Sequence, residues 1–429
     1  MSVEVYQENI REFSSKRQEP EWLRQKRLAS LALVAELDLP KLEKTNVKSW
    51  GFTDFVPVPS EQSVQTLQQL PASIRDSIAA GDVGTGLYVQ KNQESIFEQV
   101  DPELQKQGVI FTSLEQAIQE HGELVEKYLL QAFQNNEHQV AALHGALLSG
   151  AFLYVPRNVE VKVPQQAIFA LAGNRTAAFP HLLVVAETGS KVEVIANYFD
   201  YEGRPTVLNS VIEVYVKPSA HVQVTTVNHT SSSVVDTIYR RAIVERDGHL
   251  EWVIGDFSSG RLLSDQTTYL RGEGAHVGVK SLALGAGSLR SNITSSISHF
   301  ARHTTSDIQA RSVVKDEATN ILNSITKIEK GASQSDGQQS GKVLMLDSEA
   351  RGDANPILLI DENDVTAGHA ASVGRVDPLQ LYYLMSRGIS RAEAEKLIVF
   401  GFLDAVIREI PSESLQNHLR QIVERKFDQ

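Results

Sequence analysis

The stretch that decides the fold of this chain reads Val211-Ile212-Glu213-Val214-Tyr215-Val216 and then, four residues later, His221-Val222-Gln223-Val224-Thr225-Thr226-Val227. In both segments apolar side chains recur at every second position over most of the length. Successive side chains of a β-strand point to opposite faces, so this period of two predicts strands with one apolar face. Because no helical segment separates the two segments, the strands follow one another directly.

The same alternation begins near residue 150 and continues for roughly two hundred residues. It recurs at 159–163 and 191–195, and turns with glycine or polar residues interrupt it at 188–190, 247–248, 272–274 and 285–287. The pattern fits a β-sandwich, or a pair of sandwiches, as well as a β-solenoid. The length favours a solenoid, because a sandwich of this size is unusually large, whereas a solenoid grows by adding coils that bury their apolar faces on one another.

Both ends of the chain have a helical period instead. Leu23, Leu28 and Leu31 fall near one stripe of a predicted helix, and Ser113 with Gln116 resembles a capping box at the start of a second. A third helix is predicted over 137–148. The changes of period indicate three regions, namely a mainly helical N-terminal domain at 1–149, a β core at 150–377 and a helical domain at 378–429.

The C-terminal region has the pattern of a neutral, apolar helical module. Asp377 before Pro378 is typical of a helix start, and Ser390 with Glu393 forms a capping box. Three short helices have more apolar surface than they can hide among themselves, so we expect part of it to bind a partner and a chain ending near residue 377 to stay folded. The residues expected to form this docking surface are Leu379, Tyr382, Tyr383, Leu397, Ile398, Leu403, Val406 and Ile407.

The composition excludes several classes of function. The 429 residues include 41 Lys and Arg against 53 Asp and Glu, and the net charge of −12 argues against a nucleic-acid partner. The sequence has neither a basic, apolar leader nor a run of about 18 apolar residues, so we expect a cytoplasmic protein without a membrane partner. It contains no cysteine. Alone it therefore cannot hold a metal cluster through thiolates or carry a persulfide.

An enzyme is the competing interpretation. No Gly-x-Ser-x-Gly elbow is present, and the glycine-rich segments at 285–288 and 331–333 lack the Lys-Ser/Thr of a phosphate-binding loop. Asp256, Asp265 and Asp307 are the carboxylates that a stand-alone β-helix enzyme acting on polysaccharides would use. Unpaired, solvent-facing Asp is the commoner state, so this function stays the alternative.

Two histidine patterns invite a metal interpretation. His299 and His303 are four residues apart, and on a strand that spacing separates side chains by about 13 Å, which is too far for one ion. We therefore predict a structural role for this pair. His369 lies in the run of small residues 367–372, which would let a metal or another chain approach its imidazole. A lone histidine is nevertheless more often a packed or surface residue.

The residues around His369 carry a resemblance to a known family. Residues 364–378 read Asp-Val-Thr-Ala-Gly-His-Ala-Ala-Ser-Val-Gly-Arg-Val-Asp-Pro, and Ser386-Arg387-Gly388-Ile389-Ser390 with an amphipathic helix follows. Upstream lie Ser306-Asp307-Ile308, Arg311-Ser312-Val313-Val314-Lys315-Asp316, Asp336-Gly337-Gln338-Gln339 and Asp353-Ala354-Asn355-Pro356. In their order and approximate spacing, from about residue 150 to 410, these motifs resemble the SufB/SufD family. That family builds iron–sulfur clusters on a scaffold driven by an ATPase.

The resemblance implies both a fold and a function. The fold is mainly β, with a right-handed parallel β-helix core flanked by N-terminal and C-terminal α-helical domains. The function is that of a non-catalytic, SufD-like scaffold subunit in a SufB–SufC–SufD complex for iron–sulfur cluster assembly. The β-helix would pair with a SufB-like subunit, and the helices of 378–429 would bind a SufC-like ABC ATPase. A homodimer is the expected form in isolation.

The resemblance also singles out His369. In the SufD branch a Cys-x-His pair occupies the positions of Ala367 and His369, at the interface where the cluster is thought to be assembled. Ala367 cannot bind metal, so the thiolates would belong to the SufB-like partner. We therefore expect no cofactor on this chain alone, and a transient iron–sulfur cluster or iron at the interface, with His369 as the candidate ligand.

Overall fold

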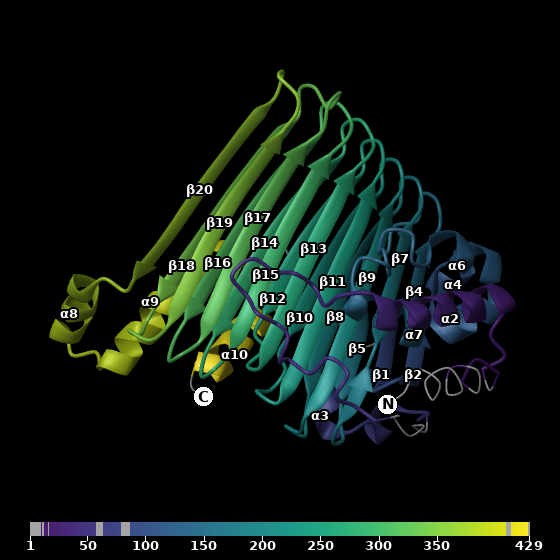
Figure 1. The fold of residues 1–429 in the computed structure, drawn as a ribbon, viewed down its shortest axis with the longest axis horizontal. Coiled ribbons are helices and arrows are strands. Elements are labelled where there is room, and N and C mark those ends of the chain that lie inside the picture. The colour runs from purple at the N-terminus through teal and green to yellow at the C-terminus, as the bar shows by residue number, and fades with distance from the viewer. Residues whose placement is uncertain are drawn as a thin grey trace.

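The chain folds into a parallel β-solenoid with helices at both ends (Figure 1). The computed structural model describes residues 10, 13–15, 17–56, 63–78, 86–408 and 413–427. Two ten-stranded sheets enclose one core between them. This confirms the predicted β core with helical ends.

The strands of the first sheet, in order across it, are β2 (Glu94–Val100), β1 (Gly86–Lys91), β5 (Gln165–Leu171), β8 (Lys191–Asp200), β10 (His221–Asn228), β12 (His249–Asp256), β14 (His276–Gly285), β16 (Thr305–Val314), β18 (Asp336–Met345) and β20 (Thr366–Arg375). Those of the second are β19 (Arg351–Ile360), β17 (Thr319–Ile328), β15 (Arg290–His299), β13 (Arg261–Leu270), β11 (Val234–Val244), β9 (Thr206–Val216), β7 (Pro180–Ala186), β4 (Ser149–Val155) and β3 (Ile110–Ser113), with β6 (Thr176–Ala178) beside β9.

From β8 onward the chain crosses from one sheet to the other after every strand. From β9 onward each strand pairs in parallel with the strand two places earlier in the chain, as β10 does with β8 and β12 does with β10. Consecutive strands of a sandwich built from hairpins would pair antiparallel within one sheet. The parallel pairing therefore decides between the two folds that the alternation left open.

Tight turns connect the strands at the four predicted positions. The backbone is left-handed at Gly189 (φ 70°), Gly274 (φ 71°) and Gly287 (φ 60°), a conformation that glycine adopts without a steric penalty. At the remaining turn Asp247 takes the same region (φ 53°), which Asp tolerates better than most residues. These residues fix where each coil bends.

The interior between the sheets is apolar through most of its length. Val192, Val194, Val214 and Val222, which the alternation places on one face, are all buried in one core cluster. Trp252 is fully buried in the same cluster. Burying one such Val side chain contributes about 1.5–3 kcal/mol, so the shared core is the main stabilising feature of the coils.

The N-terminal region covers one end of the solenoid and the outer face of the second sheet. Its helices are α2 (Glu21–Glu36), η1 (Leu67–Gln69), α3 (Ala72–Arg75), α4 (Pro102–Lys106), α5 (Leu114–Glu120), α6 (Gly122–Tyr128) and α7 (Gln139–Leu147). The region was predicted to be mainly helical, yet it also adds β1, β2 and β3 to the two sheets. Ser113 caps α5 as predicted. The strand predicted at 159–163 is wrong, because Glu160 forms only an isolated bridge there.

Glu213 ties this region to the solenoid. Its side chain points outward from β9 but is fully buried beneath the N-terminal region. The carboxylate accepts hydrogen bonds from the backbone N–H groups of Leu130 (2.6 Å), Ala132 (2.7 Å) and Phe133 (2.8 Å), and it lies 3.0 Å from Nε2 of His181. A buried carboxylate needs such partners, so this contact fixes the two parts together.

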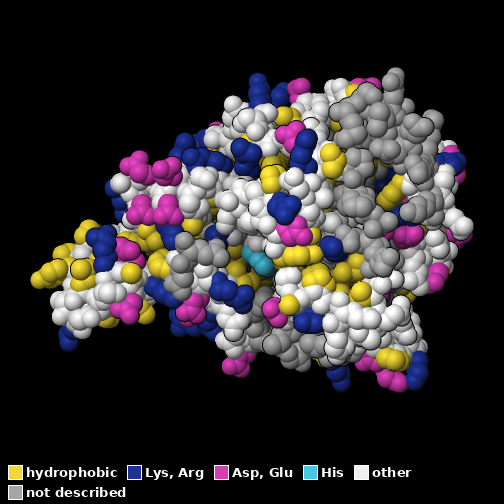
Figure 2. Space-filling view, turned by 90° about the horizontal axis from the view of Figure 1, so that it is seen from below, with side chains coloured by type: hydrophobic (Ala, Val, Ile, Leu, Met, Phe, Trp, Pro, Cys, Tyr) yellow, Lys and Arg dark blue, Asp and Glu magenta, His cyan; other side chains and the backbone are white. Residues whose placement is uncertain are grey.

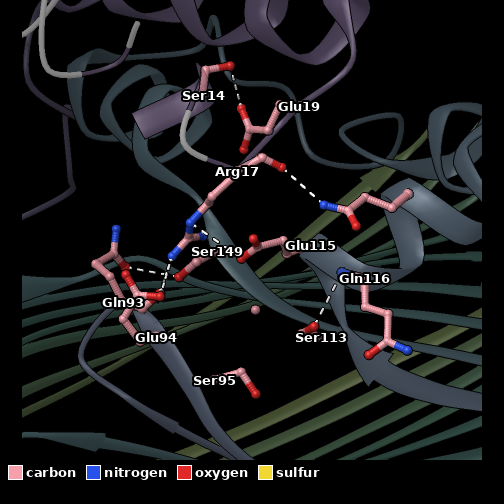
Figure 3. Close-up of polar contacts among 12 residues, drawn as sticks. Ser14, Arg17, Glu19, Gln93, Glu94, Ser95, Ser113, Glu115, Gln116 and Ser149 are labelled. Atoms are coloured by element: carbon pink, nitrogen blue, oxygen red, sulfur yellow. Dashed lines mark hydrogen bonds and ion pairs between the residues drawn. The ribbon is translucent and has the colours of Figure 1, made fainter. Parts of the chain in front are cut away.

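Arg17 makes a link within the N-terminal region, between the start of the chain, β2 and α5, shown in Figure 3. Its guanidinium lies 2.7 Å from Oε2 of Glu94 and 3.4 Å from Oε2 of Glu115, and it donates to the carbonyl of Gln93 at 3.2 Å. The adjoining cavity has a volume of about 20 Å³. That is room for about one water molecule, so this polar pocket is structural and not a substrate site.

The C-terminal helices are α8 (Pro378–Ser386), α9 (Arg391–Ile407) and α10 (Glu413–Phe427). Asp377 caps α8, accepting a hydrogen bond from the backbone N–H of Leu379 at 2.9 Å. Ser390 and Glu393 form the predicted capping box of α9. Helices α9 and α10 pack on the outer face of the first sheet, whereas α8 stands away from the solenoid (Figure 1). Within the described residues, no helix has the length and apolarity needed to span a membrane.

Candidate functional site

The candidate site lies where the solenoid stops, at β19 and β20. Both strands are the last of their sheets, so in the described structure one backbone edge of each has no neighbouring strand. We call these two strands the open end (Figure 1). An unpaired edge offers N–H and C=O groups to a strand of another chain.

His369 belongs to a row of side chains that faces the interior. In register, Val279 lies beside Ile308, Ile308 beside Gln339, and Gln339 beside His369. Val279, Ile308 and Gln339 are buried, but His369 is exposed because no coil follows β20. The imidazole therefore occupies a core position at the mouth of the solenoid.

The rows on either side of His369 end in small residues. Ala367 lies beside Gly337, and Ala371 beside Gly341. These side chains leave the imidazole accessible from the open end, as predicted from the small neighbours. None of the residues that the structure describes forms a hydrogen bond or ion pair with His369, so both ring nitrogens remain available to a ligand or a proton.

The open end also exposes apolar side chains. Ile357, Leu359 and Ile360 on β19 and Val373 on β20 are exposed, with Leu359 at 47%. Large exposed apolar residues beside unpaired strand edges mark a surface suited to another protein. These side chains lie on the same terminal strand as His369 or on the terminal strand of the facing sheet, across the mouth of the solenoid.

The eight residues predicted to bind an ATPase do not form one surface. Leu379 (74% exposed), Tyr382, Tyr383 and Leu397 are exposed, and Ile398 is half-buried. Apolar side chains gather over this projecting part of the molecule in Figure 2. We define the exposed set Leu379, Tyr382, Tyr383 and Leu397 as the α8–α9 surface.

The other three predicted docking residues are buried. Leu403, Val406 and Ile407 pack in the cluster that joins α9 and α10 to the first sheet, and each is 1% exposed. The prediction that these three residues belong to the docking surface is therefore wrong. The periodicity of α9 does not tell which of its apolar side chains meet the chain's own sheet. The same contact argues against a separable tail, since removing 378–429 would uncover the sheet residues Val253 and Leu282.

Comparison with known proteins decides the family. Residues 169–402 match the family model described as SUF system FeS cluster assembly, SufBD core domain, and residues 5–167 match the SufBD protein N-terminal region. The chain is 43% identical to the iron–sulfur cluster assembly protein SufD of Bacillus subtilis over 429 residues, covering 99% of this chain and 98% of that protein. This chain belongs to the SufBD family. It is also 30% identical to a SufBD family protein of Staphylococcus aureus over 94% of this chain and 89% of the relative.

In this SufBD protein the carboxylates of the competing enzyme interpretation lie apart. Asp256 faces the interior, where it is buried against Arg240 at 3.2 Å. Asp265 is on the second sheet and pairs with Arg241 at 2.6 Å, whereas Asp307 is on the first sheet. These three residues therefore do not form the predicted carboxylate site.

The histidine pair of this SufBD protein is also separated. His299 is buried at the end of β15, within 2.8 Å of the hydroxyl oxygens of Thr304 and Ser306. His303 lies in the following turn, exposed and 3.7 Å from Glu273. Burial lowers the pKa of His299 to about 4, so its imidazole is neutral. Its contacts support the structural role predicted for it.

Proposed function

We propose that this chain is a non-catalytic scaffold subunit of the SufD type, which pairs through its open end with a SufB-like subunit during iron–sulfur cluster assembly. The observation that carries the proposal is the exposed His369 at the end of an otherwise buried row, between two unpaired strand edges. A partner solenoid that extends the two sheets would cover the exposed apolar residues of β19 and β20.

The chemistry at this interface follows from the residues on both sides. The chain has no cysteine, and Ala367 stands where the family resemblance implies a thiol. His369 would supply a nitrogen ligand to iron or accept a proton, while the SufB-like subunit would supply the thiolates. The cluster is cargo in this proposal and not a resident cofactor.

The α8–α9 surface is proposed to bind a SufC-like ABC ATPase. Tyr382 and Tyr383 are aromatic residues on a helix that stands away from the solenoid, and such residues dominate the energetics of protein interfaces. Leu403 and the other buried residues of α9 would transmit force from the ATPase to the first sheet. These buried residues would support the ATPase-binding helices rigidly without contacting the ATPase themselves.

Three variants separate the parts of the proposal when the chain is co-expressed with a SufB-like subunit and a SufC-like ATPase. Leu359→Glu should lose the SufB-like subunit, since it places a charge in the apolar open end. Tyr382→Ala should lose the ATPase and keep the SufB-like subunit. His369→Ala should keep both partners and lose cluster formation, measured by absorbance after anaerobic reconstitution with iron and a sulfur source.

The matched control is Val56→Ala, which removes another exposed apolar side chain, whose backbone N–H bonds to the carbonyl of Arg175 near the opposite end of the solenoid. It should retain both partners and cluster formation. Normal co-purification by Leu359→Glu would contradict pairing through the open end, and normal cluster formation by His369→Ala would make the subunit purely architectural. In isolation the open end should pair with a second copy, so light scattering should show a dimer that Leu359→Glu dissociates.

A further inference from the structure

A cluster of two histidines and one glutamate lies on the outer face of the first sheet, three strands away from β20. His249 and His276 begin the adjacent strands β12 and β14 and lie in register, and Glu251 follows His249 on the same face. Nε2 of His249 is 3.1 Å from Oε1 of Glu251, and Nε2 of His276 is 3.4 Å from the same oxygen. The ligand atoms of the three residues lie within 4.8 Å of one another.

The donor set indicates the class of ion. Two imidazole nitrogens and one carboxylate oxygen suit borderline divalent transition metals such as Zn²⁺ and Fe²⁺, whereas Mg²⁺ and Ca²⁺ prefer oxygen ligands alone. His249, Glu251 and His276 are all partly exposed. An ion held by them would therefore keep positions open toward solvent.

Contacts around the cluster orient both imidazoles. Nδ1 of His276 lies 2.7 Å from Oγ1 of Thr305, the next residue in register on β16. When Nδ1 donates its hydrogen to that hydroxyl, the lone pair of Nε2 is directed toward Glu251. The ring of His249 stacks on that of His276, with centroids 4.3 Å apart and planes 18° apart. This stacking keeps the two Nε2 atoms on one side.

Gly278 provides the space that the carboxylate occupies. It is the register partner of Glu251 on β14, and a Cβ atom built there would lie 2.4 Å from Oε2 of Glu251. The backbone of Gly278 is not left-handed, so its conformation does not require glycine. Glycine is required instead by the close approach of the Glu251 carboxylate. The sheet is thus shaped to let Glu251 reach both histidines.

Lys280 contacts the Glu251 carboxylate through the oxygen that does not face the histidines. Nζ of Lys280 lies 3.5 Å from Oε2, the other carboxylate oxygen. Lys280 therefore leaves Oε1 free to face the two imidazoles. Oε1 of Glu251 and the two Nε2 atoms therefore form one convergent set of ligand atoms.

We propose that His249, Glu251 and His276 bind one divalent transition-metal ion of the Zn²⁺ or Fe²⁺ class on the outer face of the solenoid. The site does not depend on the open end or on a partner chain. It is distinct from His369, which lies on β20 and faces the interior row.

The test is a metal titration of the full chain, with any affinity tag removed and after treatment with a chelator. Isothermal titration with Zn²⁺ should give one site per chain, and Co²⁺ should give visible absorption bands. His249→Ala, His276→Ala and Glu251→Gln should each weaken Zn²⁺ binding by about tenfold or more. His303→Ala, which removes an exposed histidine from a turn, should leave the affinity unchanged.

A positioning variant tests the geometry without removing a ligand. Gly278→Ala should weaken Zn²⁺ binding, because its Cβ displaces the Glu251 carboxylate. Gly341→Ala is the matched control, since a Cβ at this strand glycine would have its nearest neighbour 3.9 Å away at Cβ of Ala354. Circular dichroism and melting of the metal-free proteins check that each variant folds.

The outcomes are decisive. Unchanged Zn²⁺ affinity in folded Glu251→Gln and His276→Ala proteins would overturn the proposal, as would the absence of any stoichiometric binding by the wild type. If an alanine variant fails to fold, the isosteric Glu251→Gln protein carries the test through its Co²⁺ spectrum. Loss of metal binding with retained SufB-like co-purification would support this site independently of the function proposed for the open end.

Discussion

Gln339 and His369 are register partners on β18 and β20, and they end a row that is buried everywhere before them. Nε2 of Gln339 donates to the backbone carbonyl of Ile357 at 3.1 Å, so the last covered position of the row is already polar. The next position is the exposed imidazole. The candidate ligand His369 is therefore exposed because no further coil covers this end of the row.

The first prediction compares two residues of this row. His369→Ala should change the free energy of unfolding by less than about 0.5 kcal/mol, because the side chain is exposed and has no described partner. Ile308→Ala should cost about 2–5 kcal/mol, because it leaves a cavity in the interior. Urea denaturation of the two variants beside the wild type measures both. A large loss for His369→Ala would show that the imidazole is part of the packed core.

The second prediction concerns the shared core. Val214 is fully buried between the sheets, so Val214→Ala should lower the free energy of unfolding by about 1–3 kcal/mol. The exposed Val373 provides the control, and Val373→Ala should have little effect. Differential scanning calorimetry should show that Val214→Ala shifts one cooperative transition of the coils. Separate transitions for two halves of 150–377 would contradict a single continuous core.

The third prediction concerns the buried ion pair of Arg240 and Asp256. Both side chains are fully buried and lie 3.2 Å apart, and Arg240 also donates to Ser264 at 2.7 Å. Arg240→Leu should cost about 3–5 kcal/mol, because it leaves the Asp256 charge without a partner. The pair of exposed Arg351 and half-buried Asp353 is the comparison, and Arg351→Leu should cost less than about 1 kcal/mol. Chemical denaturation at pH 7 distinguishes the two.

The fourth prediction is a pH dependence from His299. Burial lowers its folded-state pKa to about 4, below the ordinary value of 6.5. Between these values the unfolded chain binds the proton and the folded chain does not, so stability falls as pH falls through this window. The loss attributable to His299 between pH 7 and pH 5 should be about 2 kcal/mol. The free energy of unfolding is measured by urea denaturation at pH 7 and at pH 5. The loss between the two pH values should be smaller in His299→Gln than in the wild type by this amount, whereas His303→Gln should lose as much as the wild type.

The fifth prediction concerns truncation after Asp377. The shortened chain should aggregate or bind a hydrophobic dye, because Val253, Leu282 and Val313 lose the cover of α9 and α10. The double variant Tyr382→Ala, Tyr383→Ala should remain monodisperse, since those side chains project into solvent. Light scattering checks both. A soluble, cooperatively folded truncation would mean that the sheet does not need this cover.

The sequence alone predicted much of the local structure, because the signals were local. Alternation placed Val192, Val194, Val214 and Val222 on one face, and the turn positions followed from glycine and polar residues. The caps of α8 and α9 were also predicted, since an N-cap side chain bonds within its own first turn. Motif resemblance supplied the family and the candidate His369.

Only the tertiary structure decided which outward-facing side chains meet another part of the chain. The alternation of β9 places Glu213 on the outward face, yet Glu213 is buried under the N-terminal region. The helical period includes both Leu397 and Leu403, yet Leu397 is exposed and Leu403 packs on the first sheet. His249, Glu251 and His276 met only through the pairing of β12 with β14. Strand register brings together residues about one coil apart in sequence. Such contacts leave no trace in local periodicity, so the folded sheets alone determine them.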